Sequence, residues 1–296
     1  MDALGRTNTM IMAAFYGDAF ALGPHWIYGL AKIKDKFGHI TEVTAPLSDS
    51  YHKGKRKGDL THYGDLMLFM LKHFHRNNGF ELQTFKTEWC AFITQYQGYI
   101  DGASKKTLEN IAANHEDPVG SQSNDLAGAA FFALLFSYYA EQEMRLSKVT
   151  ELTTALHNHP DVTDAVIYFA KVALNMLSGR SIADALLNQY HSLPESTIKS
   201  LIHKGIDAKE QDSQKALSSF GVDCSINSSL PGVIQILLKH ENDFNEAMTQ
   251  NVMAGGDSAA RGIIIASLLS QQVDLNYKQF NNVNAYQTIL NNLNLS

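Results

Sequence analysis

Three aspartates that follow glycine beside strongly apolar segments are the residues of this chain best suited to chemistry. A carboxylate at the edge of an apolar helix loses hydration, so a helix N-terminus, a hydrogen-bond network or a cation must compensate its charge. One such step is a common turn or helix cap, but three in one chain predict that helix ends converge on a shared acidic pocket. The three steps are Gly17-Asp18 after Met10–Tyr16, Gly64-Asp65 before Leu66–Leu71, and Gly255-Gly256-Asp257 before Ile263–Leu269.

Apolar residues recur at helical spacing through most of the chain, which predicts that helices position these aspartates. Side chains at i, i+3 and i+4 form one face of a helix, whereas the alternation typical of a strand is confined to residues 40–44. No repeat or linker divides the chain, so we expect one all-α domain over residues 1–296. The predicted helices cover residues 11–22, 65–74, 85–99, 127–140, 162–177, 182–187, 198–205 and 261–269, with a final docked helix near residues 286–293.

Proline and hydroxyl residues mark the expected helix starts. Pro160 fits the first turn of one helix, where its missing N–H is not needed. Pro231 is expected to open another helix, with Ser228 or Ser229 as its cap. Thr84 is the expected start of the helix that contains Phe85.

Composition restricts the classes of function. The chain has 296 residues and a formal net charge of −6, which argues against a general nucleic-acid binder. No apolar run is long enough to span a bilayer. Cys90 and Cys224 have no Cys-x-x-Cys spacing, so we expect a protein of the reducing cytoplasm. Cys224 is either a reactive thiol or an inert one. The basic run 53–57 is either a solvated loop or a phosphate contact.

The three steps and their neighbours resemble the ADP-ribosylglycohydrolase family. In that family the segments Gly-Asp-Ala-Leu-Gly, Thr-Asp-Asp-Thr and Gly-Gly-Asp-Thr-Asp-Thr surround a pair of magnesium ions. The resemblance spans almost the whole chain, is strongest to the branch of J-type crystallins and selenoprotein J, and implies a single-domain orthogonal multi-helix bundle. The matching segments here are Gly17-Asp-Ala-Phe-Ala-Leu-Gly, Thr61-His-Tyr-Gly-Asp65 and Gly255-Gly-Asp-Ser-Ala-Ala-Arg261.

The chain departs from the family pattern at the metal-binding positions. If Asp65 matches the second carboxylate of the middle motif, Gly64 replaces the first one. If Asp257 matches the first carboxylate of the late motif, Ala259 and Ala260 replace the next Asp and Thr. The resemblance therefore implies that Asp65 and Asp257 are the catalytic and metal-binding carboxylates. Magnesium depends on carboxylate ligands, so we expect at most one Mg²⁺ and no two-ion site.

Seven further residues are expected to contact a ligand. Arg261 is expected to pair with Asp65 or Asp257 and to supply the positive charge that magnesium supplies elsewhere. Asp18 either binds ligand or caps a helix, Ser258 is expected to cap the late helix, and the loop 123–125 is expected by resemblance to hold ADP-ribose. The seven are Asp18, His25, Ser123, Asn124, Asp125, His157 and Arg261.

These residues lead to one functional hypothesis and two alternatives. The first is a protein that binds or hydrolyses an ADP-ribose-type or related nucleotide-sugar ligand at its glycosidic bond. The second is an inactive binding or crystallin-like structural protein on the same fold. The third is an altered enzyme that uses His25, His62 and Asp65 as metal-free acid and base groups. We expect a small-molecule ligand as partner and neither nucleic acid nor membrane; the oligomeric state is not predicted.

Overall fold

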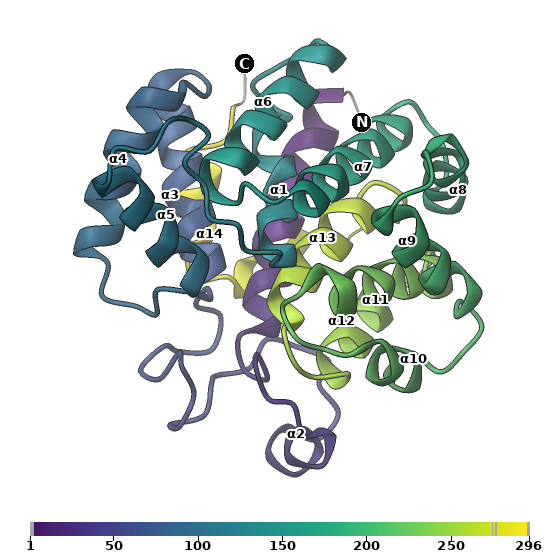
Figure 1. Cartoon of the computed structure of the whole chain (residues 1–296). Helices are drawn as coiled ribbons and strands as arrows, with labels where there is room; N and C mark the ends of the chain where they lie inside the picture. Colours follow the sequence, from purple (N-terminus) through teal and green to yellow (C-terminus); the bar gives the residue numbers. More distant parts are fainter. Residues whose placement is uncertain (1–2, 274, 276, 295–296) are drawn as a thin grey trace.

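The computed structural model describes residues 3–273, 275 and 277–294, and in these residues fourteen α-helices and three 3₁₀ helices form an all-α fold (Figure 1). The predicted all-α class is confirmed. Two isolated β-bridges are the extent of strand pairing in the described residues. The helices are α1 (Ala3–Ala21), α2 (Leu30–Phe37), α3 (His62–Asn77), α4 (Leu82–Gln95), α5 (Gly102–Ala112), η1 (Leu126–Ala129), η2 (Phe132–Leu135), α6 (Gln142–Leu156), α7 (Pro160–Leu177), α8 (Ile182–Ser192), α9 (Thr197–Asp207), α10 (Ser213–Phe220), α11 (Ile226–Lys239), α12 (Phe244–Met253), α13 (Ser258–Leu269), η3 (Tyr277–Asn282) and α14 (Tyr286–Leu290).

Helices α1 and α13 form the centre of the molecule, although almost the whole chain separates them in sequence (Figure 1). Every residue of α13 is buried, and so is α1 from residue 7 to its end. The two backbones approach closely at Gly17, where a Cβ atom would lie 2.3 Å from the carbonyl oxygen of Gly262. Glycine is therefore required at this crossing, and the close contact fixes the position of α13 along α1.

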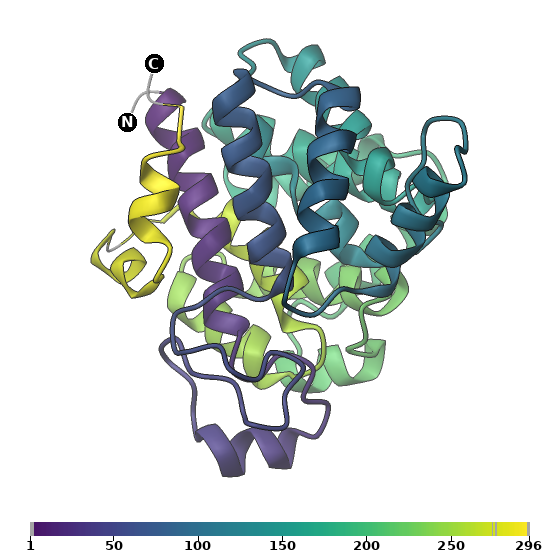
Figure 2. The ribbon, with the colours of Figure 1, turned by 90° about the vertical axis from the view of Figure 1, so that its left-hand side faces the viewer.

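The other helices pack around this central pair. Helix α3 stands beside α1 and α4 stands beside α3 (Figure 2), while α7 packs against both α6 and α8. Helix α11 packs against both α9 and α10. Helix α2 and the loop of residues 38–61 project from one end of the bundle in both views. None of the described helices combines the length and apolarity that a bilayer crossing requires.

Two predicted elements are wrong. Residues 127–140 do not form one helix but contain the two short 3₁₀ helices η1 and η2. Residues 126–136 are all buried, so their apolar pattern has no outward face that could report the helical period. Residues 40–44 are irregular because Ile40 and Val43, three positions apart, are the residues that turn inward.

Three helix starts can be compared with the predictions. Pro160 lies in the first turn of α7, as expected. Helix α11 begins earlier than predicted, with Ser225 as its cap and Pro231 inside the helix. Helix α4 begins at Leu82 because the side chain of Glu81, rather than Thr84, accepts from the first-turn N–H groups.

Candidate functional site

Two carboxyl groups from distant parts of the chain meet at the hydroxyl of Tyr63. Its Oη lies 3.2 Å from Oδ2 of Asp257 and 3.4 Å from Oδ2 of Asp125. Asp257 caps α13 by accepting from the N–H of Ala260, and Asp125 caps η1 by accepting from the N–H of Ala127. Both carboxylates therefore lie at helix N-termini, where the partial positive charge favours an anion. We call Asp125, Asp257 and the neighbouring thiol of Cys224, whose ligand atoms lie within 4.8 Å of one another, the acidic cluster.

Burial makes both carboxyl groups of the acidic cluster harder to ionise than ordinary carboxyl groups. Burial, followed by the charge of Asp257, raises the pKa of Asp125 well above its usual range. Burial also raises the pKa of Asp257 to about 6, against the opposing effect of the Arg261 charge. The Tyr63 hydroxyl has a single proton and can donate it to one carboxylate only. The raised pKa directions of both aspartates agree with a site in which two carboxyl groups compete for this one proton.

The glycine pair before Asp257 explains how the chain delivers this carboxylate. Gly255 and Gly256 have φ values of 75° and 67°, in the left-handed region that favours glycine. A Cβ atom on Gly256 would lie 1.9 Å from the carbonyl oxygen of Val222, and one on Gly255 would lie 2.6 Å from that of Ile27. The loop thus threads between two other segments, and any larger residue would displace Asp257.

Arg261 supports this loop from inside the protein. It is fully buried and donates to Oδ1 of Asn251 at 3.0 Å and to the carbonyl oxygen of Gly255. Burial lowers the pKa of its guanidinium to about 10. The sequence predicted that Arg261 would pair with Asp65 or Asp257. Its guanidinium instead donates to Asn251 and Gly255, and its charge acts on Asp257 from a longer distance by opposing the rise of the Asp257 pKa. Asp257 rather than Ser258 is the cap of α13, so the capping role predicted for Ser258 is wrong.

Asp65 has other partners than the acidic cluster. Its Oδ2 accepts from Nζ of Lys55 at 2.6 Å and from the hydroxyl of Tyr96 at 2.5 Å. Asp65 is partly exposed and lines a cavity of about 630 Å³. The charge of Asp65 is therefore compensated by the ammonium group of Lys55 rather than by the guanidinium of Arg261. The remaining cavity lining is supplied by Tyr51, His52, Lys53, Gly54, Gln97, Gly98 and Tyr99.

Asp18 supports the start of α3. Its carboxylate is fully buried and accepts from the backbone N–H of Thr61 at 2.7 Å and from the Thr61 hydroxyl. Burial raises the pKa of Asp18 to about 7. Both oxygens are engaged by Thr61, so the structure gives Asp18 a supporting position rather than the ligand-facing one expected from the sequence. Gly64 makes this position possible, because a Cβ there would lie 2.1 Å from Oδ2 of Asp18.

The loop 123–125 reaches the acidic cluster through its last residue. Ser123 Oγ accepts from the N–H of Asp125, and the amide of Asn124 donates to Oγ of Ser225. Ser123 and Asn124 are half-buried and hold the loop in shape. His157 is buried against Gly128, where a Cβ would lie 2.6 Å from its ring, and burial lowers its pKa.

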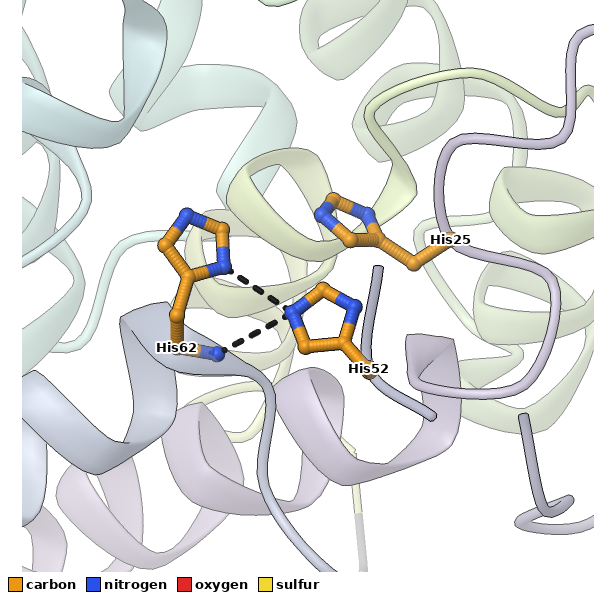
Figure 3. Close-up of side chains that lie close together, drawn as sticks. All are labelled: His25, His52 and His62. Atoms are coloured by element: carbon orange, nitrogen blue, oxygen red, sulfur yellow. Dashed lines mark hydrogen bonds between the residues drawn. The ribbon is translucent and has the colours of Figure 1, made fainter. Parts of the chain in front are cut away.

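Three buried histidines adjoin the acidic cluster (Figure 3). His52 Nε2 lies 3.0 Å from His62 Nδ1 and also accepts from the His62 backbone N–H at 3.3 Å. His25 Nδ1 lies 3.7 Å from Oδ1 of Asp257 and accepts from the N–H of Ala259. The sequence singled out His25 and His62 but missed His52, because a loop residue has no periodicity to reveal its neighbours.

The environment keeps the three imidazoles neutral. Burial lowers the pKa of His52 to about 4 and those of His25 and His62 well below their usual range. Cys224 is also neutral, since burial and the charges of Asp125 and Asp257 raise its pKa to about 12. Of the two interpretations of Cys224, the structure therefore favours the inert thiol.

The fold is all-helical in the described residues, with buried carboxylates at the starts of α13 and η1. The chain belongs to the ADP-ribosylglycohydrolase family, whose model matches residues 2–274. It is 20% identical over 288 residues to Crystallin J1A of Tripedalia cystophora, with 92% of this chain and 88% of that protein covered. A solved structure described as an ADP-ribosylglycohydrolase-related protein complex is 14% identical and has a TM-score of 0.76, with 99% of this chain and 96% of that chain covered.

The residues present do not fit a pair of magnesium ions. The space beside Gly64 is filled by the carboxylate of Asp18, and Ala259 and Ala260 supply no side-chain oxygen. Asp65 is already paired with Lys55. The groups close enough to share a metal ion in the described residues are instead the acidic cluster and the three histidines.

Proposed function

We propose that this protein binds an ADP-ribose-type ligand in the cavity beside the acidic cluster, without the metal-pair hydrolysis of its family. The observation that carries the proposal is the lining of this cavity. Its volume of about 630 Å³ suits a small molecule, and aromatic, cationic and carboxylate groups share its wall. An ADP-ribose-type ligand needs these same three kinds of partner: an aromatic face for adenine, cations for the pyrophosphate and acceptors for ribose hydroxyls.

The aromatic and basic residues are arranged for the nucleotide part. The rings of Tyr51 and Tyr99 meet edge-to-face with centroids 5.2 Å apart, and Tyr51 is largely exposed. An exposed tyrosine ring can stack on adenine with little loss of side-chain entropy. Lys53 and Lys55 lie on the same wall and supply positive charge for the pyrophosphate.

The acidic cluster is suited to the ribose part. The cavity wall connects to this cluster through ring contacts: the Tyr99 ring lies 5.3 Å from that of His62, and the His62 ring lies 3.9 Å from that of Tyr63, whose hydroxyl contacts Asp257. In the proposal, the loop 123–125 faces the ligand, Asp65 accepts from ribose hydroxyls, and Asp257 orients water near the anomeric carbon. The protonated carboxyl of Asp125 is the group able to protonate a leaving group. Without a metal pair, such a hydrolysis is expected to be slow.

The structural alternative is a crystallin-like protein that binds no nucleotide. The Lys55–Asp65 ion pair favours it, because a carboxylate that a lysine already neutralises needs no ligand or cation. One matched relative is named a crystallin. The two functions differ in a simple observable, the affinity for ADP-ribose.

Calorimetric titration with ADP-ribose, in EDTA and then in magnesium, tests the proposal. Tyr51→Ala and Lys53→Ala should each weaken binding about tenfold, since a stacked base contributes roughly 1–3 kcal/mol and a hydrogen bond to a charged group a similar amount. Lys209→Ala, a matched change outside the cavity lining, should bind as the unmodified chain does. No heat of binding at millimolar ADP-ribose would support the crystallin-like alternative instead.

A further inference from the structure

The three buried histidines form a second constellation, to which the ligand proposal assigns no role, although His52 also lines the cavity. They come from separate segments: His25 follows α1, His52 lies in the loop 38–61, and His62 begins α3. One ring nitrogen of each lies within 4.8 Å of the others, and Figure 3 shows the three imidazoles facing a common point. We propose that His25, His52 and His62, the three-histidine site, bind one Zn²⁺ ion.

The distances fit a zinc ion after small movements of the three rings. Zinc–nitrogen bonds of about 2.0–2.1 Å in a tetrahedron place two ligand nitrogens about 3.3 Å apart. His52 Nε2 and His62 Nδ1 are 3.0 Å apart. The ring centroid of His25 lies 5.3 Å from that of His52 and 6.1 Å from that of His62, so the third ligand needs to close in only slightly.

The unused ring nitrogen of His25 is available to the same ion. Nδ1 of His25 already faces Ala259 and Asp257, which leaves Nε2 as its ligand atom. This Nε2 is buried and has no hydrogen-bond partner among the described residues. A buried nitrogen without such a partner, on a ring turned toward two other imidazoles, is available as a metal ligand.

Two of the three histidines have a carboxylate near the ring nitrogen that does not face the proposed metal ion. Oδ1 of Asp257 lies 3.7 Å from Nδ1 of His25, and Oδ2 of Asp101 lies 3.7 Å from Nε2 of His62. In metal sites the remote N–H of a ligating histidine is usually donated to such a carboxylate, which fixes the tautomer and raises ligand basicity. Closing each gap to hydrogen-bond distance takes about 1 Å.

Zinc would replace one hydrogen bond of ordinary length and two long ones. The proton of His62 Nδ1, which lies 3.0 Å from His52 Nε2, would move to His62 Nε2 facing Asp101, and the proton now on His25 Nε2 would move to Nδ1, which now accepts from the Ala259 N–H. The backbone N–H groups of His62 and Ala259 would lose their histidine acceptors, and both of these hydrogen bonds are long, at 3.3 Å between nitrogens. His52 also lines the cavity, which provides an entry path and a fourth coordination position for water. A set of three imidazoles favours zinc over magnesium, which requires oxygen ligands.

Metal analysis and cobalt spectroscopy test this site without any nucleotide. The chain is stripped with EDTA, dialysed against Zn²⁺ and analysed for metal, then titrated with Co²⁺ as a spectroscopic substitute. We expect one zinc per chain, and for cobalt the intense visible bands of a four-coordinate ion with no thiolate charge-transfer band. His52→Gln should weaken binding at least about tenfold. His73→Gln removes a buried histidine on α3 outside the site and should leave binding unchanged.

Two further variants distinguish a metal ion in the three-histidine site from one in the acidic cluster. His52→Cys should retain cobalt and add a thiolate band, and it tests the site even if His52→Gln fails to fold. Cys224→Ser should bind cobalt as the unmodified chain does. A thiolate band in the unmodified chain that Cys224→Ser abolishes would assign the metal to the acidic cluster and overturn the proposal. Less than stoichiometric zinc in the folded, unmodified chain would overturn it as well. Because no ADP-ribose is present, neither result bears on the ligand-binding proposal.

Discussion

The carboxyl group of Asp18 shows how one residue can make stability depend on pH. It has no exposed surface, and the nearby charges include both Asp65 and Lys55. Desolvation is the largest cause of its raised pKa, so the folded protein holds this proton more tightly than the unfolded chain does. The stabilisation that the proton provides is complete below about pH 4 and is lost as pH rises toward 7.

Asp18→Asn should remove this part of the pH dependence, because the amide resembles the protonated carboxyl group. Between pH 4 and 7 the unmodified chain should lose stability relative to the variant, by up to ~4 kcal/mol for a shift of about three pH units. Urea unfolding at a series of pH values measures the difference. A difference that stays constant over this range would show that Asp18 titrates normally.

At the scale of elements, α1 can pack against the start of α3 because Gly64 has no side chain. The carboxylate of Asp18 occupies the space beside Gly64 and accepts from the N–H of Thr61, the cap residue of α3. A carboxylate from one helix therefore supports the start of another helix that begins more than forty residues later. This contact joins α3 to α1, which lie side by side in Figure 2.

Gly64→Ala should destabilise the protein by about 2–4 kcal/mol, because the new methyl group overlaps Asp18. Gly102→Ala is the matched control: it lies in the first turn of α5, where no atom is within 4 Å of the added methyl group, and should be neutral or slightly stabilising. Thermal unfolding compares the two. Equal melting temperatures would mean that α1 and α3 shift apart easily. Adding Asp18→Ala to Gly64→Ala should recover part of the loss.

The limits of sequence reasoning are visible in particular elements. Helices with one buried face, such as α7 and α9, were predictable from apolar spacing. The segment 126–136 was not, because all its residues are buried. For the site, the Gly255-Gly256 turn and Asp257 could be found as a motif. The Lys55–Asp65 pair and the place of His52 could not, because both depend on where a long irregular loop folds back.

At the scale of the whole molecule, the metal content distinguishes this chain from a metal-pair hydrolase. We expect no pair of bound Mg²⁺ ions and a shift in melting temperature below about 1 °C at millimolar MgCl₂, since weak binding adds little to stability. Hydrolysis of ADP-ribosyl-arginine with magnesium should be slow or undetectable. Calorimetry with MgCl₂ and a product assay measure both. Two tightly bound magnesium ions with rapid turnover would mean that the acidic residues rearrange to form the two-ion site of the family.

The central pairing of α1 with α13 has a consequence for biosynthesis. The inner side chains of α1 are covered largely by a helix that is translated more than 230 residues later. At about 5–20 residues per second, α1 waits roughly 12–50 s for this partner. During that interval an apolar helix is exposed at the ribosome, so nascent chains should depend on chaperones that shield such segments. The acidic cluster, whose last carboxylate directly precedes α13, comes into existence only after the chain has been translated as far as Asp257.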